Sequence, residues 1–344
     1  MTGSDRRSGG AADGPSDGAL DRRSDRGGDG SADGDGGRPG AVGSRSPATW
    51  LRAVVEMSRP DQLLLMAIVY GAGLAVGVVR GAVVDPTVAL AGYLAFLPLA
   101  ASVHYANEYA DYGTDRLADR TPFSGGSGAL ARTGLPRSLA LRAAVASLAV
   151  GTVATAVAWD AGVVGVEAVA LLAAIVTLGW GYSLPPLALA WRGVGEIDNA
   201  FLGGIALPTY GIAVATGRVA LDAAVVFVPF GFVVFVNLLA TTWPDRVPDA
   251  TVGKATLATR LGPGTLRGLY AAGTLAAAAS LAALHGDVPA VVCYAEAATL
   301  LLLVPAATRY TRQHSPFPTV AAMVTFATVQ FAAWGGVAIG VLGG

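Results

Sequence analysis

The chain has 344 residues, of which 53% are hydrophobic and only 14% are charged, whereas globular proteins average about 25% charged residues. This composition excludes an ordinary soluble domain and indicates a membrane protein. The formal net charge is −1 and no arginine-rich patch with interleaved aromatic residues is present, so we expect no nucleic-acid partner. The single cysteine excludes an internal disulfide framework and a cysteine-based metal site.

The N-terminal segment, residues 1–47, consists mainly of Gly, Ser, Asp and Arg and has almost no large apolar side chain. Such a segment buries too little surface to offset the entropy lost on ordering the chain. It also lacks the short apolar region and small-residue cleavage site of a signal peptide. We therefore expect a disordered cytoplasmic tail over residues 1–47 and a membrane domain over residues 48–344.

Apolar runs alternate with short polar connectors after the tail, and a helix needs about 20 mostly apolar residues to span a bilayer. The sequence predicts nine such helices: Gln62–Val79, Thr87–Tyr105, Leu139–Trp159, Val163–Trp180, Ala200–Thr216, Ala220–Ala240, Leu266–His285, Val288–Ala307 and Pro318–Leu342. The expected fold class is an all-α, polytopic membrane protein. Glycine and other small residues recur in these runs, which allows helices to pack closely in lipid.

Basic residues are concentrated in every second connector of this pattern. They are Arg116, Arg120, Arg132, Arg137, Arg192, Arg246, Lys254, Arg260, Arg309 and Arg312. The other connectors are short and carry few charges. Because cytoplasmic loops are enriched in Lys and Arg, we expect the charged connectors to be cytoplasmic. The protein is thus predicted to be a multi-pass cell-membrane protein with its site facing the cytoplasm.

A first acidic stretch, HYANEYADYGTDRLADRTPFSGGSGAL at residues 104–130, follows the second predicted span directly. Asn107, Asp111 and Asp115 are spaced by four, so on a helix they lie on one face with a rise of about 6 Å between neighbours. Ionisable groups so close to membrane depth are functional candidates. The glycines of SGGSGAL allow a close approach of backbone to a phosphate.

A second acidic stretch, WPDRVPDATVGKATLATRLG at residues 243–262, repeats the spacing of four with Asp245 and Asp249 and continues to Lys254, the only lysine of the chain. An even number of predicted spans separates the two stretches, so both lie on the same side and are expected to meet. Hard oxygen ligands suit Mg²⁺, which one or two carboxylates usually hold together with substrate phosphates. The sequence therefore predicts a Mg²⁺-bound diphosphate, with Lys254 as a phosphate-binding point charge.

A third stretch, GYSLPPLALAWRGVGEIDNAFLGGIAL at residues 181–207, falls on the same predicted side. Its acidic residues, Glu196 and Asp198, also fit a purely structural role, because negative charge stabilises the start of a helix. Arginines near the acidic stretches are interpreted as phosphate clamps or as interfacial anchors. The candidate substrate-binding residues are Lys254, Arg120, Arg246, Tyr182, Ser183, Arg192, Glu196 and Asn199.

The two acidic stretches resemble a known family. NEYADYGTD looks like the first aspartate-rich motif of the UbiA superfamily of intramembrane prenyltransferases, and DRVPDATVGKATLATRLG looks like the second; the resemblance covers residues 52–344. With SGGSGAL, and with YSLPP followed by GVGE, the set is most similar to the 1,4-dihydroxy-2-naphthoate polyprenyltransferases of menaquinone synthesis. The sequence departs from the family pattern at one place. Family members often carry a basic residue shortly after the Pro-Pro, whereas this chain has Ala188, Leu189 and Ala190 there, and Arg192 comes slightly later.

The resemblance implies a UbiA-type helix bundle that transfers a polyprenyl group from an allylic diphosphate to an aromatic acceptor, with Mg²⁺ as cofactor. For the naphthoate acceptor, it also implies loss of the carboxylate during prenylation. The implied catalytic and metal-binding residues are Asn107, Asp111, Asp115, Asp245 and Asp249. The alternatives are another acceptor (a phenol, an ether-lipid precursor, a haem or a carotenoid), a cation-coupled transporter, and a scaffold without catalysis. The sequence predicts neither donor chain length nor oligomeric state.

Overall fold

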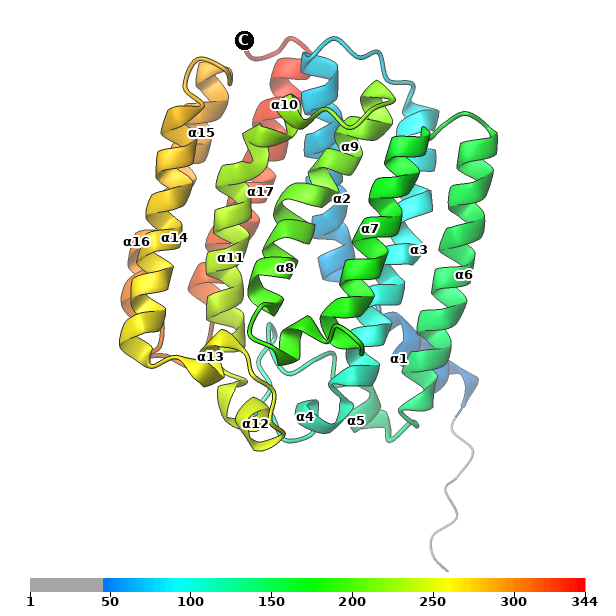
Figure 1. The fold of residues 1–344 in the computed structure, drawn as a ribbon, viewed down its shortest axis with the longest axis vertical. Coiled ribbons are helices and arrows are strands. Elements are labelled where there is room, and N and C mark those ends of the chain that lie inside the picture. Colours follow the sequence, from blue (N-terminus) through cyan, green and yellow to red (C-terminus); the bar gives the residue numbers. More distant parts are fainter. Residues whose placement is uncertain (1–45, 344) are drawn as a thin grey trace, which may run out of the picture. The chain divides into compact units, whose positions relative to one another are not determined.

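The structure is a computed structural model that describes residues 46–343, so the predicted tail lies outside the described residues except for its last two positions. The described part contains helices and no strand. The longer helices are α2 (Pro60–Val79), α3 (Pro86–Ala110), α6 (Ser138–Asp160), α7 (Val166–Ser183), α9 (Leu207–Thr216), α11 (Val228–Thr242), α14 (Pro263–Ala283), α15 (Ala290–Leu300) and α17 (Phe317–Ala338). They run side by side as a bundle (Figure 1).

Shorter helices extend or connect the long ones. They are α1 (Pro47–Met57), α4 (Tyr112–Asp115), α5 (Ala129–Thr133), η1 (Leu189–Trp191), α8 (Gly195–Phe201), η2 (Leu202–Ala206), α10 (Leu221–Ala224), η3 (Val225–Phe227), α12 (Arg246–Thr251), α13 (Leu257–Arg260) and α16 (Leu303–Arg309). Helices α4, α5, α12 and α13 gather at one end of the bundle, shown at the bottom of Figure 1, whereas α10 lies at the other end. This arrangement places both acidic stretches at the same end.

Eight helical stretches in the described part of the chain are long and apolar enough to cross a membrane. Three are composite: α8, η2 and α9 form Gly195–Thr216; α10, η3 and α11 form Leu221–Thr242; and α15 with α16 forms Ala290–Arg309. Helix α14 covers the seventh predicted run with 21 residues, but it is less apolar and is not among the eight. The expected fold class is confirmed, with eight rather than nine stretches meeting this criterion.

Small residues bring α2 and α9 into backbone contact. A Cβ atom added to Gly73 would lie 2.0 Å from the carbonyl oxygen of Pro208, and one added to Gly211 would lie 2.3 Å from that of Tyr70. Two tyrosines fasten the same region to α3, because the hydroxyl groups of Tyr70 and Tyr210 each donate to a backbone carbonyl of that helix, both at 2.8 Å. The helix crossing therefore depends on the absence of a side chain at residues 73 and 211.

We expect Gly73→Ala to lower the free energy of unfolding by about 1–3 kcal/mol, because the added methyl group forces α2 away from α9. The measurement is the thermal midpoint of the purified protein in detergent. Gly268→Ala is the matched control, because no atom lies within 4 Å of a Cβ at that position of α14. Equal midpoints for the two variants would contradict the close-contact account.

Candidate active site

The first acidic stretch keeps a helical register through a change of helix. Helix α3 ends at Ala110, Asp111 is its C-terminal cap, and α4 begins at Tyr112. The backbone N–H of Asp111 donates to Asn107 at 2.9 Å, and that of Asp115 donates to Asp111 at 2.8 Å. The three side chains are therefore spaced by one turn each along a nearly continuous helical path.

The second acidic stretch begins just after α11 ends at Thr242. Pro244 lies between α11 and α12, and α12 begins at Arg246. The N–H of Asp249 donates to the carbonyl of Asp245 at 2.9 Å. Gly253 has φ +79°, a left-handed conformation that favours glycine. This turn directs the chain back, so that the N–H of Lys254 bonds the carbonyl of Asp249 at 2.9 Å.

The two acidic stretches meet at the Lys254 side chain. Its Nζ atom lies 2.9 Å from Oδ1 of Asp111 and 3.8 Å from Oδ1 of Asp249. A second link joins the stretches, because the N–H of Gly125 donates to Oδ2 of Asp245 at 3.1 Å. Helices α4 and α12 also contact each other. The structure thus brings both acidic stretches and the intervening glycine loop, residues 124–128, together at one end of the bundle.

Burial raises the pKa values of the carboxyl groups in this cluster. The pKa of Asp115 rises to about 8, with added repulsion from Asp111 and Glu108, and that of Asp249 rises to about 7. Burial also raises the pKa of Asp245. Burial alone would lower the pKa of Lys254, but the carboxylates of Asp111 and Asp249 outweigh it and raise that pKa. The site therefore gathers several carboxyl groups around one internal cation, and without a metal ion burial favours the protonated form of Asp115 and Asp249.

The donor set fits a hard cation held jointly with a phosphate. Oδ1 of Asn107 and Oδ1 of Asp245 are buried without a hydrogen-bond partner, although such atoms are normally paired. Among the described residues, no three His, Cys, Asp or Glu side chains group closely enough to hold a metal ion by themselves. Mg²⁺ does not require this, because it keeps waters and is completed by substrate phosphates. Asn107, Asp111, Asp115, Asp245 and Asp249 would supply its protein oxygens.

The raised carboxyl pKa values predict an unusual pH dependence of stability. A carboxyl group whose folded pKa lies above its unfolded value favours the folded state when protonated. The metal-free protein is therefore expected to become more stable as the pH falls from about 8.5 to about 6.5, through the pKa values of Asp115 and Asp249. Mg²⁺ should oppose this trend, because it binds the deprotonated groups.

The measurement is the thermal midpoint in detergent over this pH range, with EDTA and with excess Mg²⁺. The matched control is the double variant Asp115→Asn with Asp249→Asn, for which the dependence in EDTA should be flatter. A midpoint in EDTA that stays level or falls as the pH is lowered, in the unsubstituted protein, would contradict the assigned direction of the two pKa shifts.

The third stretch lines the side of the cluster formed by α7 and α8. Glu196 is buried, and its Oε1 atom accepts the N–H of Leu257 at 2.9 Å, which ties α8 to the second acidic stretch. The hydroxyl of Ser183 and Oδ2 of Asp198 are buried without a partner. Tyr182 lies in the last turn of α7, and Asn199 lies half-buried in α8. The predicted span began at Ala200, but the helix starts at Gly195, so Glu196 and Asn199 belong to its first turns.

Three predicted arginines are engaged with nearby backbone. Arg120 donates to the carbonyls of Gly125 and Gly126, at 2.9 and 2.8 Å. Arg246 lies 3.7 Å from the ring centroid of Trp243 and donates to its carbonyl, and exposed Arg192 donates to Pro186. Among the described residues, Lys254 is the only one of the predicted cations that is ion-paired with a predicted metal ligand. Arg120 shapes the glycine loop in this structure, so its phosphate contact stays a prediction.

Sequence reasoning missed a buried carboxylate that holds the glycine loop. Glu108 is 3% exposed and accepts both the backbone N–H and the hydroxyl of Ser127. Nη2 of Arg59, in the turn before α2, lies 3.5 Å from Glu108, and its Nε atom is buried without a partner. A carboxylate beside Asn107 at the end of an apolar run was the available signal for Glu108. No comparable signal for Arg59 is present in the sequence.

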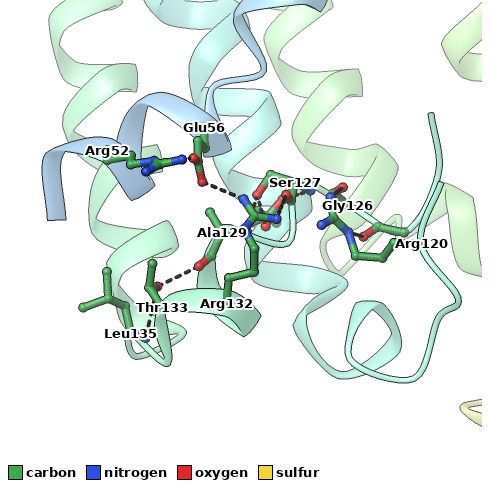
Figure 2. Close-up of polar contacts among 11 residues, drawn as sticks. Arg52, Glu56, Arg120, Gly126, Ser127, Ala129, Arg132, Thr133 and Leu135 are labelled. Atoms are coloured by element: carbon green, nitrogen blue, oxygen red, sulfur yellow. Dashed lines mark hydrogen bonds and ion pairs between the residues drawn. The ribbon is translucent and has the colours of Figure 1, made fainter. Parts of the chain in front are cut away.

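An outer layer of this network ties α1 to the same loop. Arg132 of α5 donates to the carbonyl of Ser127 at 3.0 Å and to Glu56 of α1 at 2.7 Å, and Arg52 pairs with the same Glu56 (Figure 2). The pKa of Glu56 is lowered, first by its hydrogen bond with Arg52. The glycine loop is therefore held from α3 on its buried side and from α1 on its exposed side.

The family model that matches this chain and the solved structures that resemble it point to the same fold. The profile of the UbiA prenyltransferase family matches residues 64–329. A UbiA homolog from Archaeoglobus fulgidus bound to DMAPP and Mg²⁺ is 18% identical, with a TM-score of 0.62 over 81% of this chain and 98% of its own. A digeranylgeranylglyceryl phosphate synthase is 14% identical, with a TM-score of 0.60 over 84% and 99%. An apo UbiA homolog from Aeropyrum pernix K1 is 15% identical, with a TM-score of 0.60 over 81% and 98%. A search of curated proteins gives no match.

Proposed function

Because the chain belongs to the UbiA prenyltransferase family, we propose that it transfers a polyprenyl group from a Mg²⁺-bound allylic diphosphate to 1,4-dihydroxy-2-naphthoate. The general activity, prenyl transfer in a membrane, follows from family membership. The proposal adds that Mg²⁺ is the metal, which residues form the site, and that the naphthoate is the acceptor. It also places the site on the cytoplasmic side of the membrane. The alternatives of a cation-coupled transporter and of a non-catalytic scaffold no longer apply, because the chain is a prenyltransferase.

The observation that carries the proposal is the meeting of Asp111 and Asp249 across Lys254. The two acidic stretches are far apart in the sequence, at residues 104–130 and 243–262, and they converge where buried oxygens of Asn107 and Asp245 lack partners. Mg²⁺ held together with a diphosphate would satisfy both the carboxylates and these oxygens. The A. fulgidus homolog bound to DMAPP and Mg²⁺ supports this ligand class.

The acidic residues and Lys254 would have different roles because their charges are opposite. Bound Mg²⁺ supplies positive charge to the diphosphate oxygens as the allylic C–O bond breaks. The carboxylates and Asn107 hold the donor end fixed at the end of the bundle. Lys254 stabilises the leaving pyrophosphate. The new C–C bond then forms at the ring carbon of the acceptor that carries the carboxylate, which leaves as CO₂, and the hydroxyl groups of the ring are retained.

The choice of acceptor is supported by the sequence resemblance rather than by a pocket geometry. NEYADYGTD, SGGSGAL, YSLPP and GKATLATRLG occur together and in this order. Glu196, which is bonded to the second acidic stretch, has a buried oxygen without a partner, and so has Ser183 at the end of α7, which suits an acceptor with hydroxyl groups. The cytoplasmic orientation of the site is supported by arginines at the same end of the bundle as the acidic stretches.

The test is to incubate the purified protein in lipid with Mg²⁺, a labelled polyprenyl diphosphate and 1,4-dihydroxy-2-naphthoate. Mass spectrometry should find the prenylated, decarboxylated product, and EDTA should abolish it. Release of pyrophosphate with a phenol or an ether-lipid precursor, but not with the naphthoate, would retain the prenyltransferase and overturn the acceptor. Unchanged turnover in EDTA would overturn the metal assignment.

A further inference from the structure

Lys254 occupies an unusual position for a lysine. Its side chain is 10% exposed, although lysine is rarely buried without a partner. The ammonium group is paired with one carboxylate from each acidic stretch, at 2.9 Å for Asp111 and 3.8 Å for Asp249. On another side the ring of Trp191 lies 6.0 Å from Nζ. Both carboxylates belong to the proposed metal-binding set, so the lysine occupies space and charge that a metal ion would use.

We propose that Lys254 is a built-in counter-cation that competes with the metal ion for Asp111 and Asp249 until the donor diphosphate arrives. In the absence of donor it bridges the two acidic stretches and weakens the binding of Mg²⁺ alone. When the diphosphate enters, the ammonium group turns from the carboxylates to the phosphate oxygens, which frees the carboxylates. Metal and diphosphate therefore bind together. This inference rests on the proposed function and adds that the metal ion and the donor enter the site together.

Three observations support an exchange over a fixed structural link. First, two oxygens of the same cluster, on Asn107 and Asp245, are buried and unpartnered, so Lys254 alone does not complete the site. Second, the contact to Asp249 is 3.8 Å, which is too long for a hydrogen bond and leaves that carboxylate open to a stronger partner. Third, the ammonium group is a point charge on a flexible four-carbon stem, so it can change partners without movement of the backbone.

The exchange predicts effects of opposite sign from one substitution. Lys254→Met keeps the length of the stem and removes the charge. It should tighten the binding of Mg²⁺ alone at least tenfold, because a competing cation is gone. The same variant should weaken the binding of a non-reactive donor, farnesyl thiodiphosphate, at least tenfold in EDTA, because the phosphate loses its cation. Both affinities are measured by isothermal titration calorimetry in detergent, with Mn²⁺ paramagnetic resonance as a check on metal binding.

Two further variants serve as controls. Lys254→Arg keeps the positive charge and should bind Mg²⁺ as weakly as the unsubstituted protein does. Arg137→Met removes a cation that stacks 4.0 Å from the ring centroid of Tyr109 and donates to its carbonyl, and it should change neither affinity by more than about twofold. In the unsubstituted protein, the donor analogue should raise the affinity for Mn²⁺ at least tenfold, a measurement that needs no variant.

The outcomes separate this inference from the proposed function. If Lys254 only links the two stretches, Lys254→Met loses affinity for Mg²⁺ as well as for the analogue, which overturns the exchange. Equal Mn²⁺ affinity with and without the analogue, in the unsubstituted protein, overturns it too. If the unsubstituted protein binds no analogue in the presence or absence of metal, the proposed diphosphate site itself is wrong.

Discussion

Replacement of Asp245 by asparagine is expected to lower kcat by about 10²–10³-fold while the protein stays folded. Asparagine has the same shape as aspartate, and its carbonyl oxygen can still accept the N–H of Gly125, which now lies 3.1 Å from Oδ2. The substitution removes one negative charge from the cluster that is proposed to hold a divalent cation next to the negatively charged leaving group. Asp111→Asn should behave similarly. The measurement is single-turnover release of pyrophosphate at saturating donor.

The matched control for this prediction is Asp222→Asn. Asp222 lies on α10, at the end of the bundle opposite the acidic cluster, and its carboxylate is 3.9 Å from Arg80 in an exposed pair. Its replacement should leave kcat unchanged, because an exposed ion pair contributes little. Thermal midpoints of Asp245→Asn and Asp222→Asn should match that of the unsubstituted protein within a few degrees. Turnover of Asp245→Asn within about threefold of the unsubstituted protein would refute its role as a metal ligand.

The second large effect is expected at Glu108. Glu108→Ala removes the acceptor for the hydroxyl and N–H of Ser127 and the nearest carboxylate to Arg59. Unpaired buried donors each cost about 1–3 kcal/mol, so the glycine loop should loosen. Because this loop also contacts Asp245, we expect the KM for the donor to rise about tenfold to 100-fold, with a smaller change in kcat.

Glu108→Gln tests whether the effect comes from position rather than from charge. The glutamine carbonyl still accepts one hydrogen bond from Ser127, so the KM should return most of the way to its original value. Glu56→Ala is a second control, because Glu56 belongs to the exposed layer of the same network. An unchanged KM in Glu108→Ala would show that the loop does not help to hold the donor. A fall in kcat alone would assign Glu108 to a different step.

Several features of this protein could be predicted from the sequence because they depend on the spacing of residues along a helix and on the number of membrane spans. The spacing of four in Asn107, Asp111 and Asp115 appears as successive backbone hydrogen bonds from one residue to the fourth before it. The even number of predicted spans placed both acidic stretches at one end, and the structure has them at one end. Helix α14, the one predicted span that is not among the eight apolar stretches, does not affect this result because it follows the second stretch.

Other features were not visible in the sequence because they depend on which side chain a loop brings close. The sequence does not show that Arg120 donates to the carbonyls of the glycine loop or that Arg246 stacks on the Trp243 ring, and the phosphate contacts of both residues stay predictions. Glu108 lay beside the expected ligands and its role required the fold of the glycine loop. Composite spans were also hidden: hydropathy is continuous over Gly195–Thr216, whereas the backbone changes helix type at Leu202.

An experimental structure with farnesyl thiodiphosphate, and with Mn²⁺ in place of Mg²⁺, would show whether metal and diphosphate bind between the two acidic stretches. We expect anomalous peaks for Mn²⁺ between the two acidic stretches, each within about 2.0–2.3 Å of a carboxylate oxygen of Asp111, Asp115, Asp245 or Asp249 and of a diphosphate oxygen. We also expect the ammonium group of Lys254 to lie on the diphosphate rather than on Asp111. A diphosphate bound elsewhere in the bundle, or metal peaks away from both stretches, would contradict the account.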